Sequence, residues 1–468
     1  MLRWRPIPRL ILLVEPQEFV VYSDGVQPAL DGRGMSGEVL SGIPKGIHAI
    51  AKPVGSRCNM KCDYCFYLEK ESLYPGKESF NMPEDVLRAF IKSYIKSQPT
   101  PEVEFVWQGG EPTLRGIDFY RKALQYQKRY RASKTIRNSI QTNGTLLTDE
   151  WCDFLKQNEF LVGLSLDGPA DIYDRYRHNR AGQPAFNEVM RGLRLLKKWG
   201  VEFNVLACVA GETAHRPLEV YRFFKEQEVA FIQFIPVVER MPDPKETESG
   251  LHFASPPKRG TAESPARVTP WTVEAGKYGD FLVAVFDEWV RQDVGKVFVM
   301  NFEWALNAAL GMGSPICIFS QQCGRAVAVE HNGDVYACDH YVYPEYRLGN
   351  LGRDDLASMV QSSLDGGFGS HKEHMLPSCC RECEALRACW GGCPKHRFIQ
   401  SPQGQPELNY LCAGYKKFFK HSTRYMIAFR KLIELGLEPA LIMEAIGRPL
   451  VIPPSERTGN QQIVLWIK

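Results

Sequence analysis

The distribution of cysteine constrains this chain more than any other feature of its sequence. Among 468 residues there are 14 cysteines: Cys58, Cys62 and Cys65 fall within eight residues, and nine more lie between positions 317 and 412. A disulfide framework is typical of small secreted chains, whereas this chain is large, shows no export signal and groups its thiols tightly. Thiols clustered in this way indicate metal or iron–sulfur ligands.

The opening group of Cys58, Cys62 and Cys65 offers three thiols and has no fourth ligand nearby. Three thiolates can hold three irons of a [4Fe–4S] cluster and leave the fourth iron open to an external ligand, as a catalytic zinc site keeps one position free. A zinc ion completed by a distant histidine or cysteine is the alternative. A generic group of three cysteines leaves both interpretations open.

Between about residues 48 and 238 the chain alternates short β-rich runs with helical stretches. Residues 186–200 place apolar side chains at intervals of three and four and close on Gly200, and a second helical stretch starts at Pro217. Repeated strand–helix units predict parallel strands with right-handed crossovers. Six units fall short of the eight of a closed barrel, so a partial barrel and an open sheet both fit the predicted strands, at residues 48–54, 102–108, 138–144, 160–168, 202–209 and 230–238.

Unusual residues follow four of these predicted strands. The three cysteines come after the first strand, and Gly109–Pro112 (GGEP) comes after the second. Thr142–Gly144 (TNG) ends the third strand, and Ser165–Gly168 (SLDG) ends the fourth. Functional loops of parallel α/β folds lie at the carboxyl ends of the strands. The sequence therefore predicts that these four motifs converge on one site.

Composition argues against two classes of partner. The net charge is only +3, from 57 basic and 54 acidic residues, which does not favour a nucleic acid. The sequence contains no run of eighteen apolar residues, so we expect no membrane span. Clustered free thiols favour a reducing compartment, and we expect a cytoplasmic protein.

The pattern also predicts how the chain is divided. A stretch rich in Pro, Ser, Glu and Lys predicts a surface insertion or loop, and the cysteine-rich part predicts a separate module. The predicted regions are an N-terminal extension (1–45), a partial barrel (46–240), an insertion (241–270), a connecting helical segment (271–315), a cysteine-ligated domain (316–415) and a C-terminal helical region with a tail (416–468).

The first half of the chain resembles the radical S-adenosylmethionine (SAM) superfamily. The resemblance rests on Cys-x3-Cys-x2-Cys after the first strand, on Tyr64 before the third cysteine, and on the GGEP motif. It implies that SAM chelates the open iron and that the reduced cluster cleaves SAM to a 5′-deoxyadenosyl radical. It further implies contacts to SAM from Tyr67, Gly109, Gly110, Glu111, Ser165 and Arg177, although a solvated Arg177 and a merely packed Tyr67 are the structural alternatives.

The second half resembles the twin-cluster SPASM extension of peptide-modifying radical SAM enzymes. The implied fold class is α/β: a partial (β/α)6 radical SAM barrel followed by a small cysteine-rich SPASM domain with two iron–sulfur clusters. With the first cluster this makes three [4Fe–4S] clusters. Cys379 adjoins Cys380, so the choice between them rests on spacing alone. The implied auxiliary ligands are Cys317, Cys323, Cys338 and Cys393 for one cluster, and Cys380, Cys383, Cys389 and Cys412 for the other.

Stretches such as QTNGTLL, FIQFIPVVER, EHNGDVYACDHYV and LNYLCAGY resemble one family in particular, the anaerobic sulfatase-maturating enzymes. The resemblance covers about residues 48–425. It implies oxidation of a Cys or Ser in the motif Cys/Ser-x-Pro-x-Arg of an unfolded sulfatase polypeptide to Cα-formylglycine under anaerobic conditions, with flavodoxin or ferredoxin as the reductant. The auxiliary clusters would accept or relay the substrate electron.

Asp339 matches the position of the proposed base in that family. Burial and the negative charge of a neighbouring cluster would raise the pKa of this carboxyl and make it a useful base near neutral pH, whereas a carboxylate that caps a turn is the structural alternative. Two rival functions remain at this stage. One is another SPASM enzyme that forms thioethers, epimers or crosslinks in a peptide, and the other is a zinc-rich scaffold without catalysis.

Overall fold

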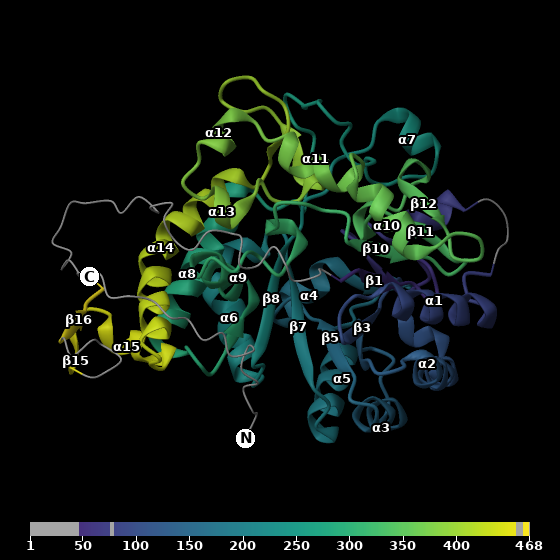
Figure 1. The fold of residues 1–468 in the computed structure, drawn as a ribbon, viewed down its shortest axis with the longest axis horizontal. Helices are drawn as coiled ribbons and strands as arrows, with labels where there is room; N and C mark the ends of the chain where they lie inside the picture. The colour runs from purple at the N-terminus through teal and green to yellow at the C-terminus, as the bar shows by residue number, and fades with distance from the viewer. Residues whose placement is uncertain (1–45, 75–78, 455–461, 468) are drawn as a thin grey trace.

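One sheet of ten strands organises the chain, in the order β12-β11-β10-β1-β3-β4-β5-β7-β8-β9 (Figure 1). The computed structural model describes residues 46–74, 79–454 and 462–467, so the predicted N-terminal extension lies outside the described residues. The strands of the sheet are β1 (His48–Ala51), β3 (Glu102–Trp107), β4 (Thr135–Thr142), β5 (Leu161–Ser165), β7 (Phe203–Val209), β8 (Phe231–Pro236), β9 (Phe298–Val299), β10 (Ala326–Val329), β11 (Asp334–Tyr336) and β12 (Arg347–Asn350).

The six strands predicted between residues 48 and 238 are confirmed, and they pair in parallel in the order β1-β3-β4-β5-β7-β8. Along β3 the side chains of Val103, Phe105 and Trp107 are buried, whereas those of Glu102 and Glu104 are exposed, as the two-residue period of a strand requires. Strands β12 and β9 stand at opposite ends of the order, so the sheet does not close on itself. The parallel part is therefore a partial barrel, as the predicted fold class states.

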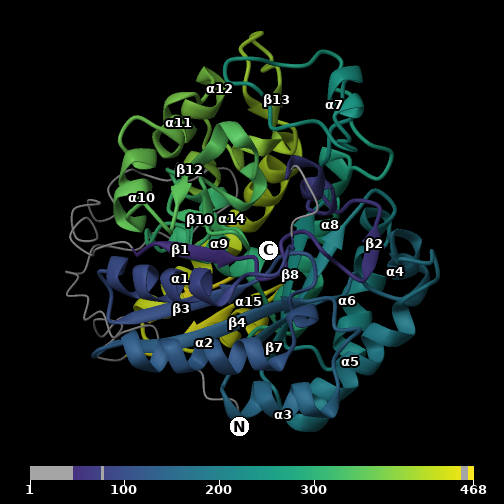
Figure 2. The ribbon, with the colours of Figure 1, turned by 90° about the vertical axis from the view of Figure 1, so that its right-hand side faces the viewer.

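Helices connect the parallel strands and cover the outside of the sheet (Figure 2). The predicted helix at residues 186–200 is confirmed as α5, which buries Val189, Leu193 and Leu196 and ends at Gly200 with φ of 62°. Helix α6 begins at Pro217, as predicted. The covering helices are α1 (Glu84–Ser97), α2 (Ile117–Tyr130), α3 (Asp149–Gln157), α4 (Ala170–Tyr176), α5 (Phe186–Trp199), α6 (Pro217–Glu226) and α8 (Ala275–Gln292).

The cysteine-rich segment differs from the separate module that its composition predicted. Strand β10 pairs in parallel with β1, from His48–Ala326 to Ala51–Val329, so this segment extends the sheet of the barrel. Strands β11 and β12 continue it in antiparallel pairs. The helices of the segment lie over the strand ends in Figure 1; they are α10 (Leu356–Leu364), α11 (Phe368–His374), α12 (Ser378–Arg381) and α13 (Leu386–Cys389).

The predicted insertion at 241–270 packs against the rest of the molecule. It contains the short helix α7 (Pro244–Glu248), and its backbone N–H groups at Glu263 and Gly260 donate to the carbonyl oxygen of Phe398 at 2.7 Å and to Oε1 of Glu407 at 2.6 Å. Both acceptors belong to the cysteine-rich segment. The insertion thus helps to hold that segment over the strand ends.

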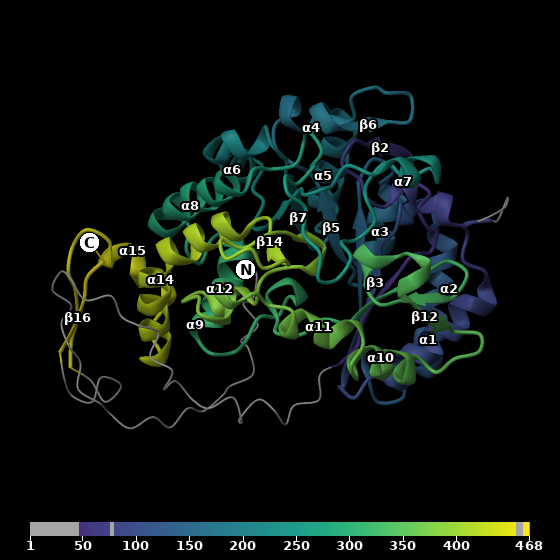
Figure 3. The same ribbon diagram turned by 90° about the horizontal axis from the view of Figure 1, so that it is seen from above.

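Two long helices, α8 and α14 (Cys412–Glu434), lie side by side, because Gly279 of α8 faces Gly414 of α14 without intervening side chains (Figure 3). Within residues 46–74, 79–454 and 462–467, none of the helices combines the length and apolar character needed to cross a bilayer. The remaining elements are α9 (Met300–Ala309), α15 (Ile442–Ala445), the paired strands β2 (Met60–Cys62) with β6 (Arg177–Asn179), β13 (Arg397–Ile399) with β14 (Leu408–Asn409) and β15 (Leu450–Ile452) with β16 (Ile463–Leu465), and the 3-10 helices η1 (Leu68–Leu73), η2 (Pro112–Arg115), η3 (Thr213–His215), η4 (Cys317–Phe319), η5 (Asp339–Tyr341), η6 (Pro344–Tyr346), η7 (Pro394–His396) and η8 (Pro439–Leu441).

Candidate active site

The loop that follows β1 carries Cys58, Cys62 and Cys65, and the three side chains lie near one another. Burial raises the pKa of Cys58 to about 12, with a smaller contribution from Cys65. Burial also raises the pKa of Cys62, and the neighbouring guanidinium of Arg177 opposes that rise. Thiols held in such surroundings stay protonated until a metal replaces the proton, which is how metal binding is coupled to thiol ionisation.

Gly109 and Gly110 fix the position of this cysteine loop. The N–H of Gly110 donates to the carbonyl oxygen of Gly55 at 2.8 Å, and the N–H of Glu111 donates to that of Arg57 at 2.8 Å. A Cβ on Gly110 would lie 1.9 Å from the carbonyl oxygen of Arg57, so only glycine fits. The two glycines therefore allow a close approach of the backbone to the cysteine loop itself, a role that the sequence did not predict.

Glu111 is fully buried, and its carboxylate is held by donors from two strand ends. It accepts from the N–H of Thr113 at 3.0 Å, from the hydroxyl of Thr142 at 2.8 Å and from the N–H of Asn143 at 2.8 Å. Burial raises the pKa of Glu111, and these hydrogen bonds oppose the rise. Because Thr142 and Asn143 belong to the TNG motif, Glu111 joins the second and third predicted motifs into one network.

Arg177 is a buried residue, so its alternative as a solvated surface arginine is wrong. Its guanidinium forms a two-pronged pair with Asp167 of the SLDG motif, with Nε–Oδ2 at 2.8 Å and Nη2–Oδ1 at 3.0 Å. Asp167 also accepts from the backbone N–H of Cys208 at 2.9 Å. The fourth predicted motif thus reaches the cysteine loop through Arg177, and the sequence reasoning gave no role to Asp167, the only acidic residue of SLDG.

Ser165 and Tyr67, the other two predicted SAM contacts, also have partners within the chain. The hydroxyl of Ser165 accepts from Nε2 of Gln141 at 2.9 Å. The hydroxyl of Tyr67 donates to the buried carboxylate of Glu330, which follows β10. The side chains expected to contact SAM therefore surround the first cysteine loop, and each is held in place by a neighbouring strand end.

Asp339 lies beside this first site although it is 274 residues away from Cys65 in the sequence. It forms an ion pair with Lys52, whose side chain is 1% exposed and which follows β1. The ammonium of Lys52 also stands 4.2 Å from the ring centre of Tyr67. The predicted base is thus linked to the loop of the first three cysteines through Lys52 and Tyr67. The local sequence around Lys52 does not predict this contact.

The pKa of Asp339 is lowered, opposite to the sequence prediction. Burial by itself would raise the pKa of this carboxyl, but the ammonium of Lys52 and the ring of His340 stabilise its charged form and reverse the direction. The predicted rise rested on burial and on the negative charge of a neighbouring cluster and did not include the buried ammonium of Lys52. Asp339 is therefore ionised near neutral pH and free to accept a proton, but its lowered pKa makes it a weaker base than the sequence predicted.

The cysteines of the C-terminal segment fall into two further groups. Burial raises the pKa of Cys323 to about 12, and the thiols of Cys393 and Cys317 add to the rise. Cys338 is affected by the thiols of Cys317, Cys393 and Cys323 in the same way. These mutual effects show that the four thiols predicted to share one auxiliary cluster lie together.

The second group gathers around Cys389 and Cys412. Burial raises the pKa of Cys389 to about 12, with contributions from Cys412 and Cys383, and raises the pKa of Cys380 to about 12, with contributions from Cys379 and Cys412. The adjacent Cys379 and Cys380 both belong to this neighbourhood. The choice of Cys380 as the ligand therefore stays a prediction.

The spacing of the thiols bears on the kind of centre they could hold. Among the described residues, no three His, Cys, Asp or Glu side chains stand close enough together for one metal ion. A [4Fe–4S] cluster is wider than a single ion and takes one thiolate at each iron, so its cysteines stand further apart. The thiols of the described residues thus form three groups, which equals the number of [4Fe–4S] clusters predicted from the sequence.

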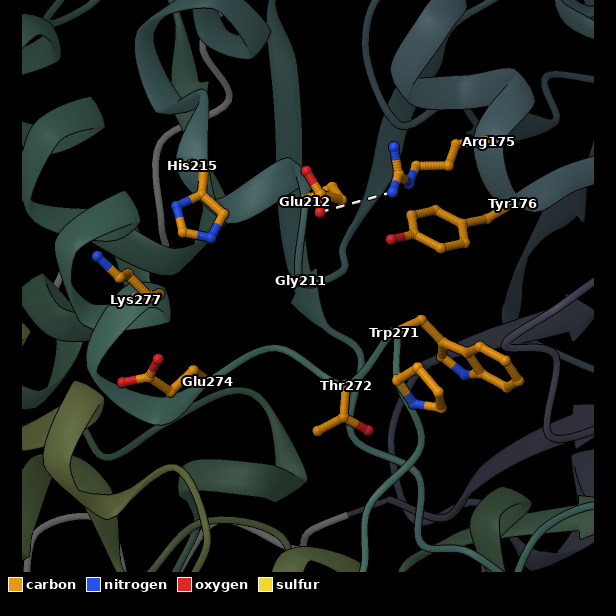
Figure 4. A pocket seen from close by; sticks show the side chains of 10 residues that line it. Arg175, Tyr176, Gly211, Glu212, His215, Trp271, Thr272, Glu274 and Lys277 are labelled. Atoms are coloured by element: carbon orange, nitrogen blue, oxygen red, sulfur yellow. Dashed lines mark ion pairs between the residues drawn. The ribbon is translucent and has the colours of Figure 1, made fainter.

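A cavity of about 370 Å³ opens between the ends of β7 and α4 and the start of α8 (Figure 4). Arg175 pairs with Glu212 at 3.5 Å on one side, and Glu274 and Lys277 lie across from them. Tyr176 lines the cavity and packs at a tilt of 56° against Tyr64, with a centroid distance of 5.9 Å. One aromatic layer therefore separates this polar cavity from the first cysteine loop.

Comparison with known proteins agrees with this architecture. Residues 53–224 match the radical SAM superfamily, and residues 317–384 match an iron–sulfur cluster-binding domain known as SPASM. A solved structure of native anSMEcpe with bound AdoMet and a Cp18Cys peptide superposes with a TM-score of 0.71 at 31% identity, covering 83% of this chain and 100% of that one.

Two curated relatives extend the comparison over most of the sequence. The serine-type anaerobic sulfatase-maturating enzyme of Bacteroides thetaiotaomicron is 45% identical over 403 residues, which cover 86% of this chain and 95% of the relative. The cysteine-type enzyme of Clostridium perfringens is 33% identical over 392 residues, covering 83% and 97%. With its radical SAM barrel, its SPASM segment and this similarity along nearly the whole length of its relatives, the chain belongs to the family of anaerobic sulfatase-maturating enzymes.

Proposed function

We propose that this enzyme oxidises a Cys or Ser side chain in a sulfatase Cys/Ser-x-Pro-x-Arg motif to Cα-formylglycine without oxygen. The observation that carries the proposal is the position of Asp339, a partly buried carboxylate of the SPASM segment that pairs with Lys52, whose ammonium stands 4.2 Å from the ring centre of Tyr67. A proton acceptor beside a radical-generating centre is what the oxidation of a thiol or hydroxyl requires. A scaffold protein would have no use for it.

Three groups of cysteines would hold three [4Fe–4S] clusters. Cys58, Cys62 and Cys65 would ligate the first and leave one iron for SAM, and the other two clusters would take four thiolates each. When bound, the first cluster and SAM supply a 5′-deoxyadenosyl radical, which removes a hydrogen atom from the substrate Cβ. The auxiliary ligands would be Cys317, Cys323, Cys338 and Cys393, and Cys380, Cys383, Cys389 and Cys412.

The predicted SAM contacts would act around this first site. Tyr67, Ser165 and Arg177 surround the cysteine loop, while Gly109, Gly110 and Glu111 set its backbone. Arg177 is already paired with Asp167 through two of its five N–H groups, so we infer that any contact with the SAM carboxylate uses its remaining donors and its charge. Asp167 acts as the group that orients this arginine.

The chain's own contribution to the oxidation is the removal of one proton. Asp339 would accept it from the substrate thiol or hydroxyl, and Lys52 would keep the carboxylate ionised and fixed. Loss of a hydrogen atom, a proton and an electron converts Ser to the aldehyde directly. Cys gives a thioaldehyde, which water then hydrolyses to the aldehyde with release of hydrogen sulfide.

An external donor must supply the electron for SAM cleavage, and we propose flavodoxin or ferredoxin in an anaerobic cytoplasm. A sulfatase segment that is not yet folded would be the substrate, because a motif inside a folded sulfatase could not reach a buried carboxylate. One cavity of suitable polarity lies next to the first cysteine loop.

The test uses the anaerobically loaded enzyme with SAM, a chemical reductant and two peptides that differ only in Cys or Ser at the first motif position. Mass spectrometry should detect formylglycine on at least one peptide, and the 45% identical serine-type relative makes the serine peptide the first to examine. Formation of 5′-deoxyadenosine without formylglycine on either peptide would refute the proposal. A product of a different mass would instead indicate another SPASM chemistry.

A further inference from the structure

Two cations in the SPASM segment are buried without an acidic partner. Lys372 of α11 is 1% exposed and Arg397 of β13 is 2% exposed. Among the described residues, neither forms an ion pair with an aspartate or glutamate, and both direct their charge at backbone carbonyl oxygens. Burying a charge in this way is unfavourable unless a counter-charge lies nearby.

The contacts of Lys372 fix the chain around Cys317. Its ammonium donates to the carbonyl oxygens of Cys317 at 2.7 Å and Ile318 at 2.8 Å, and also to that of Ser320. These carbonyls come from η4 and the residue after it. The positive charge is thus placed beside one proposed ligand of the first auxiliary cluster.

The contacts of Arg397 fix the loop between Cys389 and Cys393. Its guanidinium donates to the carbonyl oxygens of Gly391 at 2.9 Å and Trp390 at 2.6 Å, and Nη1 donates to that of Lys372 at 2.6 Å. A Cβ on Gly391 would stand 2.6 Å from Nη2, so the loop is closed tightly around the guanidinium. Arg397 therefore links the loop of the second thiol group to the helix that carries Lys372.

Cysteine side chains, which carry a negative charge only as thiolates, lie near both cations. Burial lowers the pKa of Lys372, and the thiols of Cys323, Cys317 and Cys393 oppose this. Burial also lowers the pKa of Arg397, and Cys323, Cys380, Cys393 and Glu407 oppose this. The hydrogen bonds of Arg397 hold the loop between Cys389 and Cys393, and these two cysteines belong to different thiol groups.

We propose that Lys372 and Arg397 are fixed counter-charges that raise the reduction potentials of the auxiliary clusters. A cluster held by four thiolates is an anion, and each added electron makes it more negative. A buried cation nearby lowers the free energy of the reduced state more than that of the oxidised state, because water does not screen it. The inference rests on the auxiliary ligands assigned under the proposed function, and it makes these clusters better acceptors for the substrate electron.

The test measures potentials in the full-length chain with Cys58, Cys62 and Cys65 changed to alanine, so that only auxiliary clusters load. Redox titration followed by electron paramagnetic resonance compares Arg397→Gln and Lys372→Gln, which remove a charge, with Arg397→Lys, which keeps one. Arg347→Gln is the matched control, because Arg347 lies in the same segment but is half-exposed and paired with Asp334. Iron content is measured first on every variant.

We expect each glutamine variant to lower the midpoint potential by at least about 59 mV, which corresponds to a tenfold change in a one-electron equilibrium. Arg397→Lys and Arg347→Gln should change the midpoint potential by less. Loss of iron from Arg397→Gln but not from Arg397→Lys would also support a counter-charge. Unchanged midpoints in the glutamine variants, or equal loss of iron in both Arg397 variants, would overturn the proposal. The redox titration needs neither SAM nor peptide, so its result can be interpreted even if the enzyme forms no formylglycine.

Discussion

Replacing Lys52 by methionine removes the partner of Asp339 while keeping a side chain of similar length. Removing one member of a buried ion pair costs about 3–5 kcal/mol, because the other charge is left without compensation. The side chain of Lys52 is 1% exposed, but that of Asp339 keeps 14% of its surface exposed to water. We therefore expect a loss near the lower end of that range, about 3 kcal/mol in the free energy of unfolding.

A double-mutant cycle separates the pair from other effects of the substitution. Urea unfolding of anaerobically loaded protein is compared for Lys52→Met, Asp339→Asn and the double variant. Because the double variant has no buried unpaired charge at this position, we expect it to be more stable than Lys52→Met alone, with a coupling of about 1–3 kcal/mol. Strictly additive effects of the two substitutions would show that the pair contributes nothing.

The same variant tests the role of Lys52 in the reaction. Lys52→Met should still cleave SAM, but formylglycine formation should fall about 100-fold or more, because proton acceptance by a misplaced carboxylate loses the benefit of general base catalysis. Lys70→Met is the matched control: Lys70 is equally buried but stands against Glu69 and the ring of Tyr343. An unchanged ratio of formylglycine to 5′-deoxyadenosine in Lys52→Met would refute the reasoning.

Four further outcomes are expected. Asp339→Asn should retain SAM cleavage and lose formylglycine formation about 10²- to 10⁴-fold, and equal loss of both products would contradict a role as base. Changing Cys58, Cys62 or Cys65 to alanine should abolish SAM cleavage, as measured by 5′-deoxyadenosine release. Gly110→Ala, whose Cβ would lie 1.9 Å from the carbonyl oxygen of Arg57, should lose the iron of the first cluster, whereas Gly276→Ala, whose Cβ would make only an ordinary 3.5 Å contact with Oε1 of Glu274, should keep its full iron content. Burial raises the pKa of Glu303 on α9, so ionisation costs stability as pH rises through that pKa; Glu303→Gln should therefore raise the melting temperature more at about pH 8 than at about pH 5, and an equal effect at both would argue against a buried acid.

Local sequence patterns predicted much of the fold. The six parallel strands follow from short apolar runs between amphipathic helices, and α5 ends at Gly200 because the left-handed conformation there suits glycine. The extension of the sheet by β10 could not be predicted in this way. Pairing of β10 with β1 joins residues that are 278 positions apart, and the sequence of neither strand indicates which strand it pairs with.

For the site, the sequence by itself determined which groups are predicted to carry the chemistry, because the cysteine spacings, the GGEP motif and Asp339 can all be identified along the chain. The tertiary structure decided how those groups are charged and held. It placed Lys52 against Asp339 and so reversed the expected direction of that pKa, and it paired Arg177 with Asp167. The physical reason is that ligand type and spacing are local properties of a sequence, whereas the energy of a buried charge depends on the few groups that folding brings within a few ångströms of it.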